Sequence, residues 1–234
     1  KIVVALVAML CCALWGSAFP VIKIGYKFFN ISGVDTASQI LFAGVRFLIA
    51  GFLTILLGSI FADKFIVIKK KENFKKIGIL AIFQTILQYV FFYVGLAHTT
   101  GTKSSVLDST SVFFAVLISC LIFKMEKLSV NKIIGCIIGF AGVVLINITP
   151  GVSLGSFKFN GEGFIIISAL SYAFSSVLVS NYSKDESPVA LSGYQFMLGG
   201  GVMIIAGLLF GGRLKFSSLP SYAVVMYLAL LSAC

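Results

Sequence analysis

Charged residues are scarce in this sequence. Asp, Glu, Lys and Arg make up 11% of its 234 residues, whereas soluble domains contain about 25%. Hydrophobic residues make up 59%, more than a soluble core can use, so we expect a lipid bilayer around most of the chain. In a soluble protein the net charge of +10 would suggest nucleic acid. Here the cations lie in short loops between apolar runs, where they set membrane topology, so we expect no nucleic-acid partner.

Residues that bind metals or form disulfides are also few. The five cysteines lie in apolar runs without the CxxC spacing of a zinc site, and we interpret them as small packing residues. His98 is the single histidine. The sequence has no HExxH protease motif and no GxxxxGK[ST] nucleotide motif, and it lacks the second intramembrane carboxylate of an aspartyl dyad. We therefore expect no enzyme, no metal or other cofactor, and no direct use of ATP.

Proline is rare as well, with four residues, so the apolar runs can form the helices that satisfy backbone groups in lipid. A span needs about 20 residues. Run lengths predict seven spans and part of an eighth, at residues 2–22, 38–61, 76–97, 104–123, 131–148, 163–182, 190–210 and 221–234. The fold class is thus an all-α polytopic membrane protein. Since the last run is too short to span, we expect the sequence to be a piece of a longer protein.

Two similar stretches, GVRFLIAG at 44–51 and GYQFMLGG at 193–200, lie 149 residues apart. The spans before them also pair, because ALWGSAF at 13–19 resembles ALSYAF at 169–174. Span two then matches span seven, so the repeat unit is five helices, and an odd number inverts the second copy. The sequence predicts two inverted five-helix repeats, ten helices in full, of which about seven and a half are present. The predicted domains are residues 1–148, an extracytoplasmic linker at 149–160, and a truncated second repeat at 161–234.

The cations are distributed unequally between the two sets of loops. The N-terminus and the loops on its side carry eleven, and the loops on the other side carry six. The segment 64–76 alone contributes six of the eleven. Because the side richer in cations stays in the cytoplasm, we predict a cytoplasmic N-terminus in a multi-pass protein of the cell's cytoplasmic (inner) membrane.

Several loose motifs occur in a characteristic order. They are Leu14-Trp15-Gly16-Ser17, Arg46-Phe47, Tyr93-Val94-Gly95-Leu96-Ala97, Glu126-Lys127-Leu128 and Lys132-Ile133-Ile134-Gly135, followed by Gly139 and Gly142. By these motifs the chain resembles the drug/metabolite transporter superfamily, specifically the EamA-type permeases. The resemblance covers essentially the whole chain. It implies ten helices in two inverted halves, cytoplasmic termini, and transport of amino acids, nucleosides, other metabolites or drugs, often outward.

Span four departs from that family, whose members commonly have proline at the position of Ser111 and a small residue at that of Asp108. An ionised carboxylate in lipid costs several kcal/mol, so Asp108 should face protein or water. Ser104, Asp108 and Ser111 share one helical face. Asp108 is therefore a candidate for a substrate-amine contact or an ion-coupling site, with a structural carboxylate as the alternative.

Arg46 is a second charge inside a span, and guanidinium matches a substrate carboxylate. Its alternative role is an ion pair in helix packing, and we expect Arg46 and Asp108 to lie close together. Polar and aromatic residues complete the predicted substrate pathway. For the amide side chains, the alternative role is hydrogen bonding between helices. For Trp15 and Tyr172, the alternative role is packing in the protein interior. The predicted pathway comprises Trp15, Arg46, Gln84, Gln88, Asp108, Ser111, Ser171, Tyr172 and Gln195, in which Gln195 and Tyr172 are the repeat counterparts of Arg46 and Trp15.

Gly135, Gly139 and Gly142 form a small-residue face on span five, which predicts close helix packing within one protomer or in a homodimer. Duplicated bundles are mostly carriers. The sequence therefore predicts a secondary-active permease or exporter of small metabolites that works by alternating access between the repeats. Arg46 with Asp108 would complement a zwitterion, which favours amino acids or related solutes, and a proton or a sodium ion would be the coupling partner. The alternative is a passive channel, an exchanger or a scaffold without ion coupling.

Overall fold

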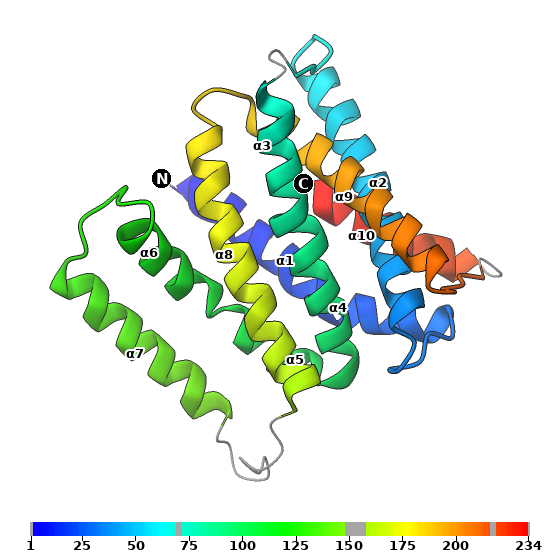
Figure 1. Ribbon diagram of the computed structural model, residues 1–234, viewed down its shortest axis with the longest axis horizontal. Coiled ribbons are helices and arrows are strands. Elements are labelled where there is room, and N and C mark those ends of the chain that lie inside the picture. Colours follow the sequence, from blue (N-terminus) through cyan, green and yellow to red (C-terminus); the bar gives the residue numbers. More distant parts are fainter. Residues whose placement is uncertain (1, 69–71, 148–157, 216–218, 234) are drawn as a thin grey trace.

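The computed structural model describes residues 2–68, 72–147, 158–215 and 219–233, and all regular secondary structure in these ranges is helical (Figure 1). Within these described ranges, six helices are long and apolar enough to cross a membrane, and two shorter apolar helices accompany them. The expected all-α polytopic fold is confirmed. The predicted linker at 149–160 falls largely outside the described residues. The elements are α1 (Ile2–Phe28), α2 (Thr36–Phe61), α3 (Glu72–Leu80), η1 (Ala81–Leu87), α4 (Gln88–His98), α5 (Gly101–Asp108), α6 (Ser111–Leu121), α7 (Val130–Asn147), η3 (Phe159–Gly163), α8 (Phe164–Tyr182), α9 (Pro188–Leu209) and α10 (Leu219–Ala233).

Two of the predicted spans are not regular α-helices. Span three, α3–η1–α4, contains the π-helical segment η1, whose turn is wider than an α-helical turn. Span four is interrupted at Ser109 and Thr110, between α5 and α6. There the Thr110 hydroxyl donates to the Leu107 carbonyl at 2.6 Å and the Ser109 hydroxyl donates to the Val106 carbonyl at 2.6 Å. Because these side chains bond the preceding turn and compete with the helical ladder, the predicted span at 104–123 consists of two helical segments, α5 and α6, within the apolar stretch Gly101–Leu121.

The centre of the fold is the contact between α2 and α9, which carry the two similar sequence stretches (Figure 1). A Cβ atom added to Gly51 would lie 2.6 Å from the Gly193 carbonyl oxygen, and one added to Gly200 would lie 2.6 Å from the Leu48 amide nitrogen. The two backbones therefore touch, as small residues allow in membrane helices.

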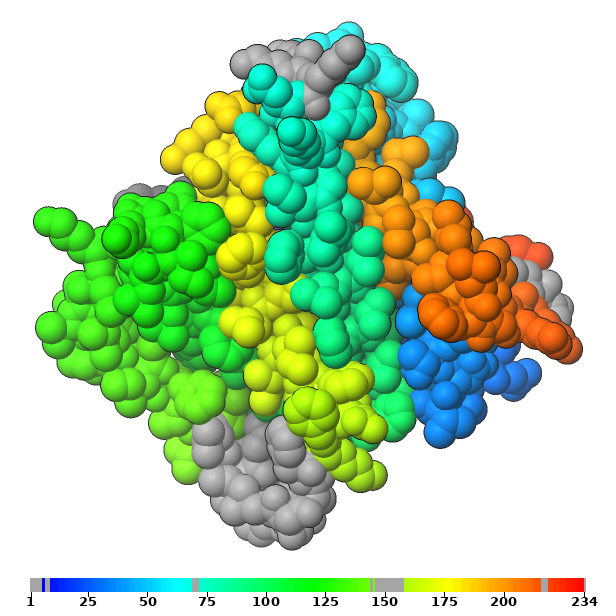
Figure 2. Space-filling view, in the orientation of Figure 1, coloured from blue at the N-terminus to red at the C-terminus, as the bar shows by residue number. Residues whose placement is uncertain are grey.

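The remaining helices are arranged around this contact in repeat-related pairs. α10 packs on α2, and its repeat counterpart, α3–η1, packs on α9. Likewise α1 packs on α10, while α8 packs on η1 and α4. Each half thus rests on the other half, so the two repeats interlock and do not form separate domains. In Figure 2, α8 lies between the surface of α3–α4 and that of α5–α7.

Two ends of the bundle are distinguished by their loops and by the bonds within them. The lysine-rich end holds the described loop residues 62–68, 122–129 and 183–187, and is fastened by Lys76–Asp185 at 2.7 Å and by the Asn73 amide donating to Glu186 at 2.6 Å. The opposite end holds the described loop residues 29–35, 99–100 and 210–215. There Glu162 accepts a hydrogen bond from the Thr99 hydroxyl at 2.9 Å and pairs with Lys103 at 3.5 Å. Both ends of the bundle are therefore held by polar contacts between helices distant in sequence.

We predict that Gly51→Ala destabilises the protein, because its methyl group would meet the backbone of α9 at 2.6 Å and force the two helices apart. Such overpacking costs about 1–3 kcal/mol, and the apparent melting temperature in detergent should fall. The matched control is Gly201→Ala, also in α9, whose Cβ would meet nothing within 4 Å. It should leave the melting temperature unchanged or raise it, since Ala is the better helix former. Equal shifts for both variants would show that the α2–α9 contact is looser than described.

Candidate functional site

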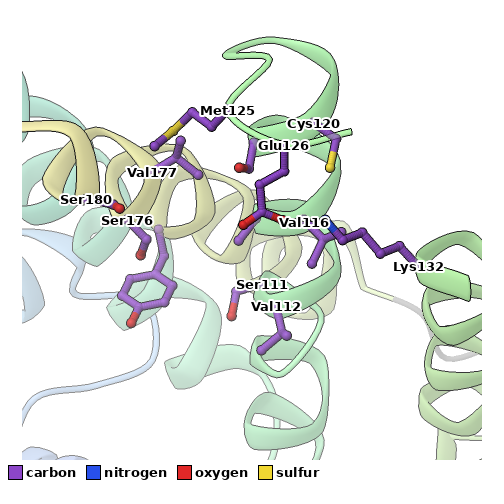
Figure 3. A pocket seen from close by; sticks show the side chains of 13 residues that line it. Ser111, Val112, Val116, Cys120, Met125, Glu126, Lys132, Ser176, Val177 and Ser180 are labelled. Carbon is purple, nitrogen blue, oxygen red and sulfur yellow. Dashed lines mark hydrogen bonds and ion pairs between the residues drawn. The ribbon is translucent and has the colours of Figure 1, made fainter. Parts of the chain in front are cut away.

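Two clefts approach the break between α5 and α6 from opposite ends of the bundle. The first, of about 480 Å³, lies between α6 and α8 at the lysine-rich end (Figure 3). Its polar lining includes Ser111, Tyr172, Ser176 and Ser180. The second, of about 470 Å³, lies between α1 and α5 at the opposite end and is lined by Gly16, Phe19, Pro20, Lys23, Gly101, Thr102 and Ser105. We call them the α6–α8 cleft and the α1–α5 cleft.

The mouth of the α6–α8 cleft carries an ion pair. Figure 3 shows the Lys132 side chain extending from α7 towards Glu126, and the two groups are bonded. Lys132 lowers the pKa of the Glu126 carboxyl through this hydrogen bond and its charge. Glu126 was not among the predicted site residues. Its sequence neighbours Lys124 and Lys127 favoured a solvated interfacial charge, and only the folded chain brings Lys132 to it.

Three of the predicted pathway residues meet between the two clefts. Trp15 of α1 and Tyr172 of α8 have ring centroids 6.3 Å apart at an interplanar angle of 34°. Asp108, the last residue of α5, lies beside the Trp15 side chain. Trp15 is the neighbour of Gly16 in the α1–α5 cleft, and Tyr172 lines the α6–α8 cleft. The cluster Trp15–Asp108–Tyr172 therefore joins three helices at the point where span four is broken.

Arg46 lies elsewhere, in the aromatic core, with 1% of its surface exposed. Its Nε donates to the Leu228 carbonyl and the Ser232 hydroxyl, both at 3.1 Å, and its Nη2 donates to the Ser232 hydroxyl at 2.7 Å. Its Nη1 donates to the Tyr93 hydroxyl at 2.7 Å. The guanidinium also lies over the Phe47 ring, 4.8 Å from its centroid. Arg46 thus binds α2 to α10 and α4, and we call this group of bonds the Arg46 latch.

The expected close pairing of Arg46 with Asp108 is not formed in the described part of the chain. The ion pairs found there join Lys76 to Asp185, Lys103 to Glu162 and Lys132 to Glu126. The guanidinium is held by α10, which the sequence pattern did not place beside it. The Tyr89 ring also lies near the guanidinium, with its centroid 6.0 Å from the Arg46 Cζ atom.

Gln195, the repeat counterpart of Arg46, makes the repeat-related bond. Its amide donates to the Gln84 side-chain oxygen at 2.9 Å and so links α9 to η1. Ser232, which Arg46 binds, is the counterpart of Phe83, the neighbour of Gln84. Both members of the repeat pair therefore cross to the other half at equivalent points. We call the second bond the Gln195 latch.

Around η1 several buried polar atoms have no hydrogen-bond partner among the described residues. They are Thr85 Oγ1, Gln88 Oε1, Gln195 Oε1 and Ser168 Oγ. Ser171 is satisfied, since its hydroxyl donates to the Phe83 carbonyl at 2.6 Å. Buried polar atoms without partners are rare and are usually hydrated or flank a site that moves. The α9–η1 contact is thus polar but incompletely bonded.

The predicted packing glycines of α7 are placed differently from one another. A Cβ on Gly139 would lie 2.4 Å from the Phe113 ring, so this glycine admits α6. Gly135 and Gly142 would meet nothing within 4 Å among the described residues. Their predicted role in a homodimer stays a prediction.

Residues 2–148 match the EamA-like transporter family. An uncharacterized transporter of Archaeoglobus fulgidus is 32% identical over 193 residues, which is 82% of this chain and 52% of that protein. The uncharacterized inner membrane transporter YedA of Escherichia coli (strain K12) is 29% identical over 226 residues, which is 93% of this chain and 66% of that protein. The chain thus spans only part of the length of these curated relatives. No solved structure matches the chain.

For the Arg46 latch we predict that Tyr93→Phe lowers stability, because a hydrogen bond to a charged group contributes about 1.5–3 kcal/mol. Arg46→Gln should cost more, since it removes the contacts to Leu228, Ser232 and Tyr93 together. The double variant should be no less stable than Arg46→Gln alone, because both changes remove the same bond. The measurement is the apparent melting temperature of all four proteins in detergent. Additive losses would mean that the two side chains do not act through each other.

Proposed function

The chain belongs to the EamA-like transporter family, and we propose that it is a secondary-active transporter of small metabolites that works by alternating access. Amino acids and related solutes are the candidate cargo, and export is the proposed direction. The family and the names of the relatives make it a membrane transporter and speak against an enzyme. Ion coupling, direction and solute are parts of the proposal.

The observation that carries the proposal is the pair of clefts that end at one broken helix. The α6–α8 cleft and the α1–α5 cleft enter from opposite ends, with Asp108 and Ser111 on the two sides of the break. Transporters typically build their sites on discontinuous helices near the midplane, where inverted repeats meet. A solute held at Trp15–Asp108–Tyr172 could then reach one cleft or the other as the halves rock.

The two latches indicate which contact would move. The Arg46 latch has several bonds from a cation, whereas the Gln195 latch has one neutral bond next to a π-helical segment. Because η1 also carries unpartnered polar atoms, rearrangement there loses few bonds. We propose that α3–η1 and α8 shift against α9, while α2, α4, α10 and the Arg46 latch stay together.

For the energy source, a proton or a sodium ion is proposed, with Asp108 as the candidate coupling residue. The sequence has no nucleotide-binding motif, so ATP is not used directly by this chain.

The N-terminus is proposed to lie in the cytoplasm, because the lysine-rich end would then face inward. The second candidate is a passive channel or an exchanger without ion coupling. The described residues favour it only in that both clefts are present in one conformation.

Cysteine accessibility tests this proposal. We predict that Ser176→Cys in the α6–α8 cleft and Ser105→Cys in the α1–α5 cleft react with a membrane-impermeant maleimide from opposite sides of the membrane. Each variant is made in a protein whose native cysteines are replaced. Adding a transported solute should raise the reaction rate of one cysteine and lower that of the other, because alternating access exposes the clefts in turn.

The matched control is Glu72→Cys, an exposed position at the start of α3 outside both clefts, whose reaction rate should not respond to solute. If both cleft cysteines react at the same time and rise or fall together, the pathway is open from end to end. That outcome would support the channel and overturn alternating access. Saturable counterflow in liposomes gives the same distinction without labelling.

A further inference from the structure

Of the described carboxylates around the two clefts, Glu126 and Glu162 form ion pairs and Asp108 does not. Lys103 pairs with Glu162, Lys132 pairs with Glu126, and the Lys23 ammonium donates to the Thr99 carbonyl at 2.6 Å. Arg46 is held by its latch. Asp108 is a member of no ion pair among the described residues, and it is half-buried. The centre of the pathway therefore carries a carboxylate without a cation.

An unpaired carboxylate in a membrane span requires a counter-charge or water. The side chain beside Asp108 is the indole of Trp15, which is neutral. Tyr89 is within electrostatic range of Asp108, but its phenol is also uncharged. A positive group from outside the described residues would supply the counter-charge that Asp108 lacks.

The aromatic rings beside Asp108 favour the same kind of partner. Trp15 and Tyr172 face each other at 6.3 Å and 34°, from helices α1 and α8. The faces of such rings attract ammonium groups that lie within about 6 Å of the ring centroid, and tryptophan does so most strongly. Trp15 is 38% exposed, so its ring surface is accessible. A carboxylate together with two aromatic faces is the chemistry that recognises an organic ammonium group.

Resting on the proposed function, we propose that Trp15, Asp108 and Tyr172 bind the ammonium group of the solute, whether a primary amine or a quaternary ammonium. The adjoining clefts of about 480 and 470 Å³ lie in the usual range of about 300–1,000 Å³ for small-molecule sites. Arg46 offers no site for a solute carboxylate, because it is 1% exposed and already bonded. The cluster of Trp15, Asp108 and Tyr172 therefore recognises the ammonium end of the solute.

The chain supplies its own probe, because Trp15 is its single tryptophan. We predict that tetramethylammonium chloride changes the tryptophan fluorescence of the purified protein saturably, whereas sodium chloride and sodium acetate at the same ionic strength do not. Asp108→Asn should weaken this binding by about tenfold or more, since one lost charge contact of about 1.4 kcal/mol has that effect. Tyr172→Leu should weaken it severalfold, and Tyr172→Phe should preserve it, because the ring face is what binds.

Glu72→Gln is the matched control, since it removes a surface carboxylate and should bind like the parent. Asp108→Glu keeps the charge and should retain binding, which guards against a folding defect in Asp108→Asn.

If Asp108→Asn binds tetramethylammonium like the parent, or if acetate competes with it, the ammonium site is wrong. If no ammonium compound binds while liposomes still show saturable uptake of another solute, the ammonium site fails and the transporter stands. Binding without any transport or counterflow would keep the site and overturn the proposed function.

Discussion

The backbone contact between α2 and α9 is the constraint on which the rest of the structure depends. Glycines from both helices let the main chains approach to van der Waals distance, with added Cβ atoms only 2.6 Å from the facing backbone. In lipid, helices gain little from the hydrophobic effect, so close packing of small residues must hold them together. This contact brings the two similar stretches together and fixes where α10 and η1 pack.

The two latches follow from that placement. Arg46 and Gln195 project from equivalent points of α2 and α9, and each reaches the third span of the other half. The Arg46 site is buried and aromatic, and the cation lies over the Phe47 ring with hydroxyl and carbonyl partners from α10. The Gln195 site is neutral and lies beside a π-helical segment. Sequence divergence between the copies has thus placed unlike chemistry at equivalent positions.

Much of the fold could be predicted from the sequence, because in lipid the length of an apolar run determines a span and loop cations are easily counted. The resemblance between residues 44–51 and 193–200 also indicated which helices are equivalent. The break at Ser109 and Thr110 was not predicted, since it depends on two hydroxyls bonding their own helix. The partners of Arg46 were not predicted either, because Leu228 and Ser232 lie more than 180 residues away in sequence. Conversely, Trp15, Asp108 and Tyr172 were each singled out from the sequence, but only the fold joins them.

The difference in strength between the latches has a consequence for any cycle in which the two halves exchange roles. Two identical repeats related by a two-fold axis would give two access states of equal energy. A charged latch on one side and a single amide bond on the other remove that equality. In the alternating-access cycle proposed above, the protein would then have a preferred resting orientation encoded in its own chain. Without any gradient, one face of the membrane would meet the open form more often than the other.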